Sequence, residues 1–420
     1  MISSRLLKRT RLHLIVQDDV HMESVSLNDT FKEKSPREVA KKKILFAMIE
    51  AGTGHKSPAE AVHGALSALY PGRYTLLLLD FMKSTGCTSL DLKHKESWNF
   101  LLAHPFLCRS GEIVSDLAGP VFRLGLRYYL APFYSYAYRF VAWQRPDLIF
   151  STHPFNSLAL DHVRKKYDLR FTLLTYLTEL FNASSLWTLK GSDYFLVPTR
   201  EVKQKLARRG IAEERLKVFD FPLRSQFIIH KESEEEVIRS LRLEKGKKVL
   251  LMSLGGEGSV DLSSFIDVLV ENRVPLNVIA VTGKNNSLKK TLGARYKSLR
   301  GCVTLRVLGY TEHMNDLMGA ADFCFIKPGP STTMEALALQ KPLIFSRPVH
   351  QGERSNIRYA VKHGIGFFAG HSPRLFLRAV NALMDDSTAL SIRNRYSTIS
   401  VSNGAEEIAR FIVRIVEEEQ

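Results

Sequence analysis

Short apolar runs recur along the chain from residue 43, and most of them end at a glycine or a polar side chain. The first series lies at 43–49, 74–79, 148–151, 171–176 and 194–197. Runs of this length, separated by segments with helical spacing, predict buried strands that alternate with helices. This alternation is typical of an α/β protein with a doubly wound parallel sheet, whose ligands bind beyond the carboxyl ends of the strands.

The pattern is interrupted at 219–224 and then starts again. A charged segment at 231–242 follows, and further apolar runs lie at 248–253, 276–281, 303–307, 323–326 and 343–345. A chain of 420 residues is long enough for two domains of ordinary size. We therefore predict a mobile N-terminal extension at 1–40, two α/β domains at 41–222 and 228–395, and a C-terminal helix within 396–420 that could pack on either domain.

One segment, 103–143, departs from this alternation. It is rich in Phe, Tyr, Leu and Arg and nearly free of acidic residues after Asp116. Aromatic and arginine side chains with few carboxylates are typical of an amphipathic segment at a membrane interface. A pair of packed helices, whose arginine stems cover the core, explains the composition equally well. The sequence leaves both interpretations open.

The charge of the chain restricts its partners. A formal net charge of +16 favours an anionic partner, and no recognisable nucleic-acid-binding module accompanies it. An anionic membrane surface is the better candidate, because basic residues near it act collectively. No apolar run is long enough to span a bilayer, and the opening segment lacks the features of a secretory signal. We expect a cytoplasmic protein that is peripheral to the inner face of the plasma membrane, or to a plastid envelope in a plant-type organism.

The four cysteines are scattered, with no paired spacing. This arrangement indicates reduced thiols and predicts neither a zinc site nor a disulfide framework.

A glycine turn follows the first apolar run and contains Gly52, Gly54 and His55. Ser57 is expected to cap the next helix, with Pro58 as its first residue. The spacing fits neither a phosphate-binding P-loop nor a dinucleotide fingerprint. His55 lies at the ligand edge of the expected sheet, although a lone histidine is usually structural. On this turn alone, both roles stay open.

A second turn, within 325–366, places Lys327 and Gly329 directly after an apolar run. The hydroxyl residues at 331–333 are expected to cap a helix from about 334 to 339. Hydroxyls, free backbone N–H groups and the positive end of the helix dipole then converge at one point, which suits a nucleotide diphosphate. The alternative is that Glu335 only completes a capping box with Thr332.

Eight dispersed motifs carry a resemblance to a known family. They are GTGH at 52–55, PDLIFSTHP at 146–154, FPLR at 221–224, GGEG at 255–258, VTGKN at 281–285, GYT at 309–311, KPGPSTTMEA at 327–336 and QGERSN at 351–356. In this order they resemble the monogalactosyldiacylglycerol synthases and processive diacylglycerol glucosyltransferases, which are related to the MurG-type transferases. The resemblance covers about 43–368. It implies a GT-B fold of two Rossmann-like domains with an interdomain cleft.

The resemblance also implies roles for single residues. The C-terminal domain would bind the UDP-sugar, with Glu335 on the ribose, Ser331 and Thr332 with Gly256 at the diphosphate, and Gln351 and Glu353 on the sugar. His55 would be the general base or a group near the acceptor hydroxyl, and Glu179 is the second expected catalytic residue. The further donor-binding residues are Gly255, Gly258, Lys327, Gly329 and Asn356, and the acceptor-side residues are Gly52, Gly54, His153 and Trp187.

One motif departs from the family pattern. The galactolipid synthases have an aspartate and a histidine where this chain has Glu179 and Ser184, while Thr178 and Trp187 keep their places. This segment belongs to the acceptor side, so the departure points to a different acceptor or to a weakened or absent activity.

The expected function is an inverting, metal-independent transfer of a hexose from a UDP-sugar to a diacylglycerol-like lipid at a membrane surface. No cofactor and no metal are expected beyond the donor substrate. One alternative is a UDP-sugar 2-epimerase of the same fold, which needs no lipid. Another is a catalytically silent GT-B protein that binds nucleotide or lipid, which the serine at 184 would allow.

Overall fold

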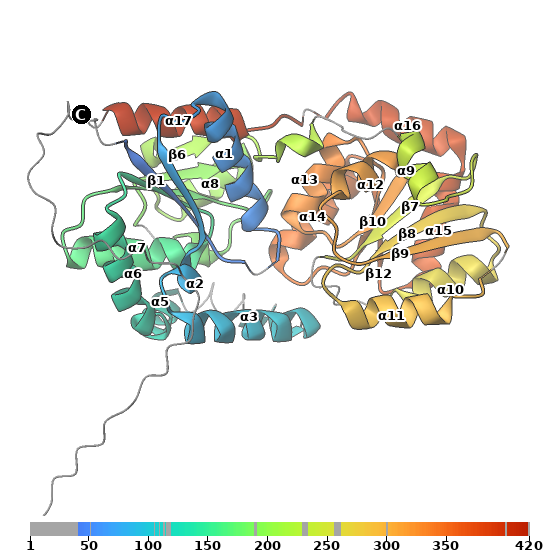
Figure 1. The fold of residues 1–420 in the computed structure, drawn as a ribbon, viewed down its shortest axis with the longest axis horizontal. Helices are drawn as coiled ribbons and strands as arrows, with labels where there is room; N and C mark the ends of the chain where they lie inside the picture. The colour runs from blue at the N-terminus through green and yellow to red at the C-terminus, as the bar shows by residue number, and fades with distance from the viewer. Residues whose placement is uncertain are drawn as a thin grey trace, which may run out of the picture. The chain divides into compact units, whose positions relative to one another are not determined.

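The computed structural model describes residues 41–418, apart from 51, 105, 109, 112, 113, 115–118, 189, 190, 229–233, 256–261, 300 and 400 (Figure 1). The N-terminal extension predicted at 1–40 lies outside these residues. So do Gly256 and Gly258, two of the expected donor-binding glycines.

Six parallel strands form the first sheet, in the spatial order β2-β1-β3-β4-β5-β6. The strands are β1 (Lys43–Met48), β2 (Thr75–Asp80), β3 (Leu148–Ser151), β4 (Thr172–Tyr176), β5 (Tyr194–Val197) and β6 (Leu216–Val218). Alternate residues of a strand face opposite sides, so that Ile44 and Phe46 join one core cluster while Leu45 and Ala47 join another. Its helices are α1 (Lys56–Leu69), α2 (Phe81–Ser84), α3 (Thr88–Ala103), α5 (Gly119–Tyr129), α6 (Ala131–Gln144), α7 (Pro154–Lys166) and α8 (Arg200–Arg208).

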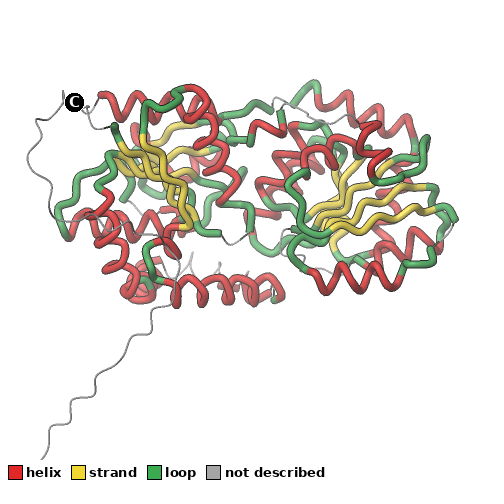
Figure 2. Tube along the Cα trace, viewed as in Figure 1, coloured by secondary structure: helices red, strands yellow, loops and turns green. Residues whose placement is uncertain are grey.

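The second sheet also has six parallel strands, in the order β12-β11-β10-β7-β8-β9, with helices packed around the strands in Figure 2. The strands are β7 (Val249–Ser253), β8 (Leu276–Val281), β9 (Val303–Leu308), β10 (Phe323–Ile326), β11 (Leu343–Ser346) and β12 (Gly366–Gly370). Its helices are α9 (Glu234–Ser240), α10 (Ser263–Glu271), α11 (Asn286–Arg295), α12 (Met314–Ala320), α13 (Pro330–Ala338), α14 (Gln351–Lys362), α15 (Pro373–Met384) and α16 (Asp386–Tyr396). The doubly wound parallel architecture predicted from the sequence is confirmed, while the exact domain boundaries stay predictions.

In each sheet the strand order reverses at one point. In the first sheet it reverses between β1 and β3, and in the second between β7 and β10. The loops that follow two such strands diverge to opposite faces of the sheet and leave a crevice between them, where ligands of this fold bind. The topology therefore predicts that ligand-binding residues follow β1, β3, β7 and β10.

Two helix starts differ from the prediction. Helix α1 begins at Lys56, with His55 as its N-cap residue, so Ser57 is not the cap. The chain already turns at Thr53, whose carbonyl accepts the N–H of Ser57 at 2.9 Å. Helix α13 begins at Pro330, four residues before the predicted start. Proline is favoured at the first helical position because it has no N–H to leave unpaired.

Two described helices of the aromatic segment at 103–143, α5 and α6, have different environments. Helix α6 packs Phe133, Ala137 and Val141 into the core, as the packed-helix interpretation expects. Helix α5 instead exposes Val121, Leu124 and Tyr128, with relative accessibilities of 74%, 69% and 85%. The spacing of these three residues places them on one face of α5. The segment thus combines a packed helix with an exposed apolar face.

Helix α17 (Ala405–Glu418) packs against α1 on the first sheet, although it follows the helices of the second. Its apolar face, which includes Phe411 and Ile412, joins the core cluster of Ile44 and Phe46. Tyr74 donates a hydrogen bond to Glu417 at 2.7 Å. This packing answers the question that the sequence left open, because the C-terminal helix belongs to the first sheet.

Candidate functional site

The first half of the site lies at the carboxyl ends of β1 and β3. These strands are neighbours in register, with Ala47 opposite Ser151, so the loops that follow them emerge side by side. Gly52 has a φ of 82°, a conformation that favours glycine, and it turns the chain toward His55. His153 lies two residues after β3, and the His55 and His153 ring centroids are 4.5 Å apart.

His55 is fixed by the loop after β3. Its Nδ1 lies 2.5 Å from the carbonyl oxygen of Thr152, and the Thr152 hydroxyl donates to the His55 carbonyl at 2.8 Å. A carbonyl can only accept, so Nδ1 carries the proton and Nε2 has the lone pair. Burial, with smaller contributions from His94 and His350, lowers the pKa of His55 to about 4. At neutral pH the ring is therefore an uncharged base.

His153 occupies the N-cap position of α7. Its Nδ1 accepts the N–H of Phe155 at 3.2 Å, and the Ser151 hydroxyl donates to its carbonyl at 3.1 Å. Burial holds the pKa of His153 well below its usual value, and the nearby His55 and His94 rings act in the same direction. This histidine is also uncharged at neutral pH.

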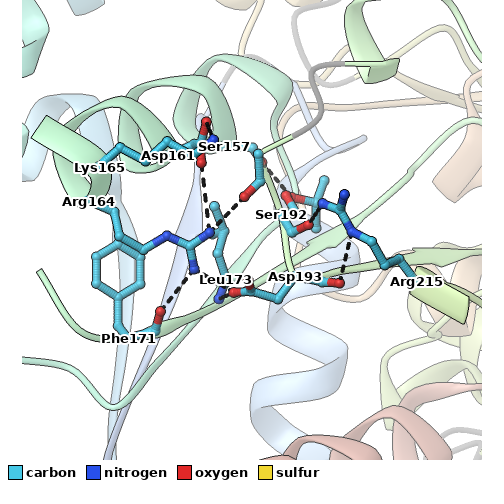
Figure 3. A network of polar contacts seen from close by, with 11 residues as sticks. Ser157, Asp161, Arg164, Lys165, Phe171, Leu173, Ser192, Asp193 and Arg215 are labelled. Carbon is cyan, nitrogen blue, oxygen red and sulfur yellow. Dashed lines mark hydrogen bonds and ion pairs between the residues drawn. The ribbon is translucent and has the colours of Figure 1, made fainter. Parts of the chain in front are cut away.

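A polar network beneath this loop holds α7 against the strands. Arg164 of α7 donates to the Phe171 carbonyl at 3.1 Å and to Asp193 at 2.5 Å (Figure 3). Arg215 donates to the carbonyl of Ser192. Ser157, also on α7, lies 2.9 Å from the Ser151 hydroxyl. Arg164 thereby ties the last turn of α7 to the sheet, and Ser157 holds its first turn next to His153 against β3.

The second half of the site follows β7 and β10. Gly255 has a φ of 98°, and a Cβ at this position would lie 3.6 Å from the side chain of Lys327. The Lys327 ammonium lies 2.7 Å from Glu353, whose other carboxylate oxygen accepts the N–H of Val349 at 2.7 Å. Burial alone would raise the pKa of Glu353, but Lys327 and His350 bring it below its usual value. An ionised Glu353 therefore holds Lys327 in place.

Glu335 is buried and does not form a capping box. No side chain of the described residues caps α13; instead the Glu335 carboxylate accepts hydrogen bonds from Arg224 at 3.0 Å and from Ser57 at 3.3 Å. Burial raises its pKa in spite of the Arg224 guanidinium. The alternative in which Glu335 only caps its helix is wrong. Its contacts join α13 to α1 and to the segment after β6, and its proposed ribose contact stays a prediction.

Glu179 lies where the family pattern changes. One of its oxygens accepts the indole N–H of Trp187 at 2.9 Å and lies 3.4 Å from the N–H of Ser184. The other oxygen is buried and has no hydrogen-bond partner among the described residues. The Thr178 hydroxyl, one residue earlier, lies 3.5 Å from Nδ1 of His55.

A single cavity of about 530 Å³ joins these groups. The predicted residues that line it are His55, Glu179, Gly52, Gly54, His153, Trp187, Gly255, Lys327, Gly329, Ser331, Thr332 and Glu353. Glu335, Gln351 and Asn356 do not line it. Asn356 donates to the Pro328 carbonyl at 2.9 Å and so supports the turn after β10.

Several residues of the cavity wall were not predicted from the sequence. His94, Ser97, Trp98 and Leu101 all come from α3, and His350 precedes α14. The spacing of the four α3 residues, which puts them on one helical face, could have indicated a shared role. Lys95 fixes α3, because its ammonium contacts Asp80 at the end of β2 at 2.6 Å.

Within the described parts of the chain we find no cluster of three or more His, Cys, Asp or Glu side chains placed to bind a metal ion. Among the same residues, none of the helices has the length and apolar character that crossing a bilayer requires.

Comparison with solved structures identifies the fold. S. aureus MnaA in a co-structure with UDP is similar with a TM-score of 0.57 and 14% identity, over 89% of this chain and 95% of that one. The Acinetobacter baumannii MurG structure also gives 0.57 and 14%, over 89% and 99% of the two chains. At this identity the likeness concerns the fold alone, which is of the GT-B type.

Sequence comparison identifies more specific relatives among proteins of this fold. Residues 126–223 match the family model for monogalactosyldiacylglycerol (MGDG) synthase, and 254–364 match the glycosyltransferase family 28 C-terminal domain. The monogalactosyldiacylglycerol synthase 2 of Arabidopsis thaliana is 26% identical over 361 residues, which cover 83% of this chain and 75% of that protein. A processive diacylglycerol beta-glucosyltransferase of Staphylococcus saprophyticus is 28% identical over 249 residues, 59% of this chain and 62% of that protein. The chain is therefore a GT-B homologue of the monogalactosyldiacylglycerol synthases and the processive diacylglycerol glucosyltransferases.

Proposed function

We propose that this protein transfers a hexose from a UDP-sugar to the hydroxyl of a diacylglycerol-like lipid, with inversion at the anomeric carbon. One observation carries the proposal. An uncharged histidine base, His55, opens into the same cavity as Lys327 and the start of α13. The relatives named above act on diacylglycerol, and this supports the choice of acceptor.

The donor end of the cavity suits a diphosphate. The backbone N–H groups of Ser331 and Thr332 lie in the first turn of α13, where the helix dipole is positive. The Lys327 ammonium, which is paired with Glu353 and oriented by it, adds a charged hydrogen-bond donor. These groups supply electrostatic stabilisation where negative charge develops on the departing UDP. They allow the transfer to proceed without a metal.

The acceptor end of the cavity suits a hydroxyl group. His55 Nε2 takes the proton of the acceptor hydroxyl as its oxygen bonds to the anomeric carbon. The bond between that carbon and the UDP oxygen breaks, and its electron pair leaves with UDP. A single displacement of this kind inverts the configuration. General-base assistance typically contributes 10²- to 10⁴-fold to such a step.

The acceptor's route into the cavity is apolar. Leu107, Phe122 and Tyr129 line this part of the wall, and Phe122 and Tyr129 belong to α5, whose outer face exposes apolar side chains. A helix with an exposed apolar face can lie in the interface of a bilayer. We therefore include in the proposal an anionic membrane surface that contacts α5 and delivers the lipid to the cavity.

An assay of UDP release tests the function directly. UDP-glucose, UDP-galactose and UDP-N-acetylglucosamine are each supplied to the full-length protein with anionic phospholipid vesicles, with and without diacylglycerol. We expect UDP release that depends on diacylglycerol with at least one donor, and a His55→Ala variant that is slower by about 10²- to 10⁴-fold. Mass spectrometry identifies the glycolipid, and the anomeric proton coupling in NMR reports inversion or retention.

Two outcomes would overturn the proposal. Absence of UDP release with all three donors and diacylglycerol excludes the transferase. Conversion of a UDP-sugar into its 2-epimer without lipid supports the epimerase instead. The solved structures do not separate these activities, because they share only the fold with this chain.

A further inference from the structure

Two adjacent histidines of the cavity wall carry their protons on different nitrogens. We propose that His153 donates a hydrogen bond from Nε2 to the same acceptor hydroxyl from which His55 removes the proton, and so positions that hydroxyl for attack. This inference rests on the proposed function and assigns a substrate-contacting role to a residue that also caps a helix.

The proton position on His153 follows from its helix cap. Nδ1 accepts the N–H of Phe155 at 3.2 Å, so this nitrogen has no proton. An uncharged imidazole then carries its proton on Nε2. The ring stays uncharged at neutral pH because it is buried beside two other histidines, His55 and His94. The positive end of the α7 dipole also opposes protonation of its N-cap residue.

On His55 the proton is carried by the other ring nitrogen, Nδ1. Its Nδ1 faces the Thr152 carbonyl at 2.5 Å and must carry the proton, so its Nε2 is bare. The two rings are 4.5 Å apart between centroids, with an interplanar angle of 62°, and both line the cavity. One cavity wall therefore presents a hydrogen-bond acceptor next to a hydrogen-bond donor.

This combination complements an alcohol. A hydroxyl has one hydrogen to donate and two lone pairs. It can donate to His55, accept from His153 through one lone pair, and keep the other lone pair for the anomeric carbon. Holding an oxygen by two directed hydrogen bonds restricts its orientation, and correct orientation is a large part of the advantage of a bound reactant.

The local structure keeps both rings in place. The Ser151 hydroxyl donates to the His153 carbonyl, and the Thr152 hydroxyl donates to the His55 carbonyl. His153 is 6% exposed. The donor and the acceptor are thus held by the loop after β3 and need no rearrangement when the lipid binds.

Two substitutions of His153 distinguish its role as the N-cap of α7 from the proposed hydrogen bond to the acceptor hydroxyl. In His153→Asn the side-chain oxygen can still accept the Phe155 N–H, since Asn is a favoured N-cap, but the side chain ends short of the Nε2 position. In His153→Gln an amide N–H reaches the Nε2 position, whereas the cap is weakened. A Ser372→Ala variant removes a cap from α15 and controls for cap loss away from the site.

For His153→Asn we expect a melting temperature close to that of the wild type and a loss of about tenfold in kcat/KM for the lipid. The affinity for UDP, measured by calorimetry, stays the same. His153→Gln recovers most of the lost kcat/KM although it melts earlier. Ser372→Ala melts earlier with normal kinetics. If His153→Asn is as active as the wild type, or if Gln gives no recovery, His153 is only a helix cap and the inference fails.

A spectroscopic measurement is independent of activity. In ¹⁵N-histidine NMR of the full chain at neutral pH, His153 should be protonated on Nε2 and His55 on Nδ1. A proton on Nδ1 of His153 overturns the inference. An inactive wild type with the expected protonation states would instead contradict the proposed function and leave no hydroxyl to bind, so the two failures can be told apart.

Discussion

At the scale of single residues, three histidines of the cavity wall, His55, His94 and His153, affect stability as well as chemistry. Burial is the main cause that lowers the pKa of His55, His94 and His153; His94 also lowers the pKa of His55, and both of these rings lower that of His153. In the unfolded chain a histidine binds a proton below about pH 6.5, whereas His55 does so only near pH 4. The unfolded state therefore binds more protons in this range.

We predict that the free energy of unfolding falls as the pH is lowered from about 6.5, by up to about 1.4 kcal/mol per pH unit for each such histidine. This contribution to stability is fully present above about pH 6.5. Urea unfolding between about pH 5 and 7 measures the slope. His153→Asn removes one titrating group but keeps the cap, so its slope should be smaller. An equal slope in the variant would contradict this account.

The sequence could select His55 and Lys327, because each follows the end of an apolar run. It could not identify their partners. The carbonyl that fixes the His55 proton belongs to Thr152, 97 residues further along the chain. The partner of Glu335 could not be predicted either. A capping box is visible in neighbouring residues of the sequence, whereas the actual partner of Glu335, Arg224, is 111 residues away.

At the scale of elements, α5 is apolar on two sides. Leu126 is buried against the body of the protein, and Val121, Leu124 and Tyr128 are exposed. We predict that replacing these three exposed residues with serine reduces binding to anionic vesicles by at least about tenfold, because each apolar side chain that enters the interface contributes to binding. Vesicle sedimentation measures the effect, and KM for the UDP-sugar should not change.

A matched control comes from the second sheet's helices. Val361, Leu375 and Leu390 are also exposed apolar residues, with accessibilities of 47%, 43% and 59%. Their replacement with serine should leave vesicle binding at the wild-type level. Equal binding by both triple variants would show that α5 is not the membrane contact.

The buried strands were predictable as elements because each forms a short apolar run. The strands β6 and β12, which are edge strands at one end of each sheet, were not predicted. Strand β6 is only three residues long and contains Lys217, and β12 begins and ends with glycine, so neither forms a clear apolar run. The first residues of helices were harder to predict than the strands. A turn such as that at Thr53 is formed by backbone hydrogen bonds, and the amino-acid composition does not indicate these.

At the scale of the whole molecule, the site depends on how the two sheets are assembled. The crevice positions follow from the strand order, and the sequence predicted the two parallel sheets but not their order. The single cavity that joins His55 to Lys327, and the face on which the last helix packs, are products of contacts between distant segments. Such contacts leave no periodic signal in the sequence.

Helix α17 packs on the first sheet, and we can predict from this packing how a substitution in α17 affects unfolding. Phe411 of α17 is 4% exposed, and its ring lies 5.4 Å from that of Tyr194 and 5.3 Å from that of Phe219. Removing a buried phenylalanine side chain typically costs about 3–5 kcal/mol. We expect Phe411→Ala to destabilise the first sheet by this amount, whereas Glu407→Ala, an exposed change on the same helix, should cost less than about 0.5 kcal/mol.

Hydrogen exchange can locate the effect, because amide protection reports local as well as global opening. In Phe411→Ala, exchange should accelerate in β1 and β3, which form the core against which α17 packs, and should change little in β7 and β8 of the second sheet. Equal acceleration in both sheets would mean that they unfold as one cooperative unit. Faster exchange confined to the second sheet, from which the chain leads into α17, would contradict the packing described here.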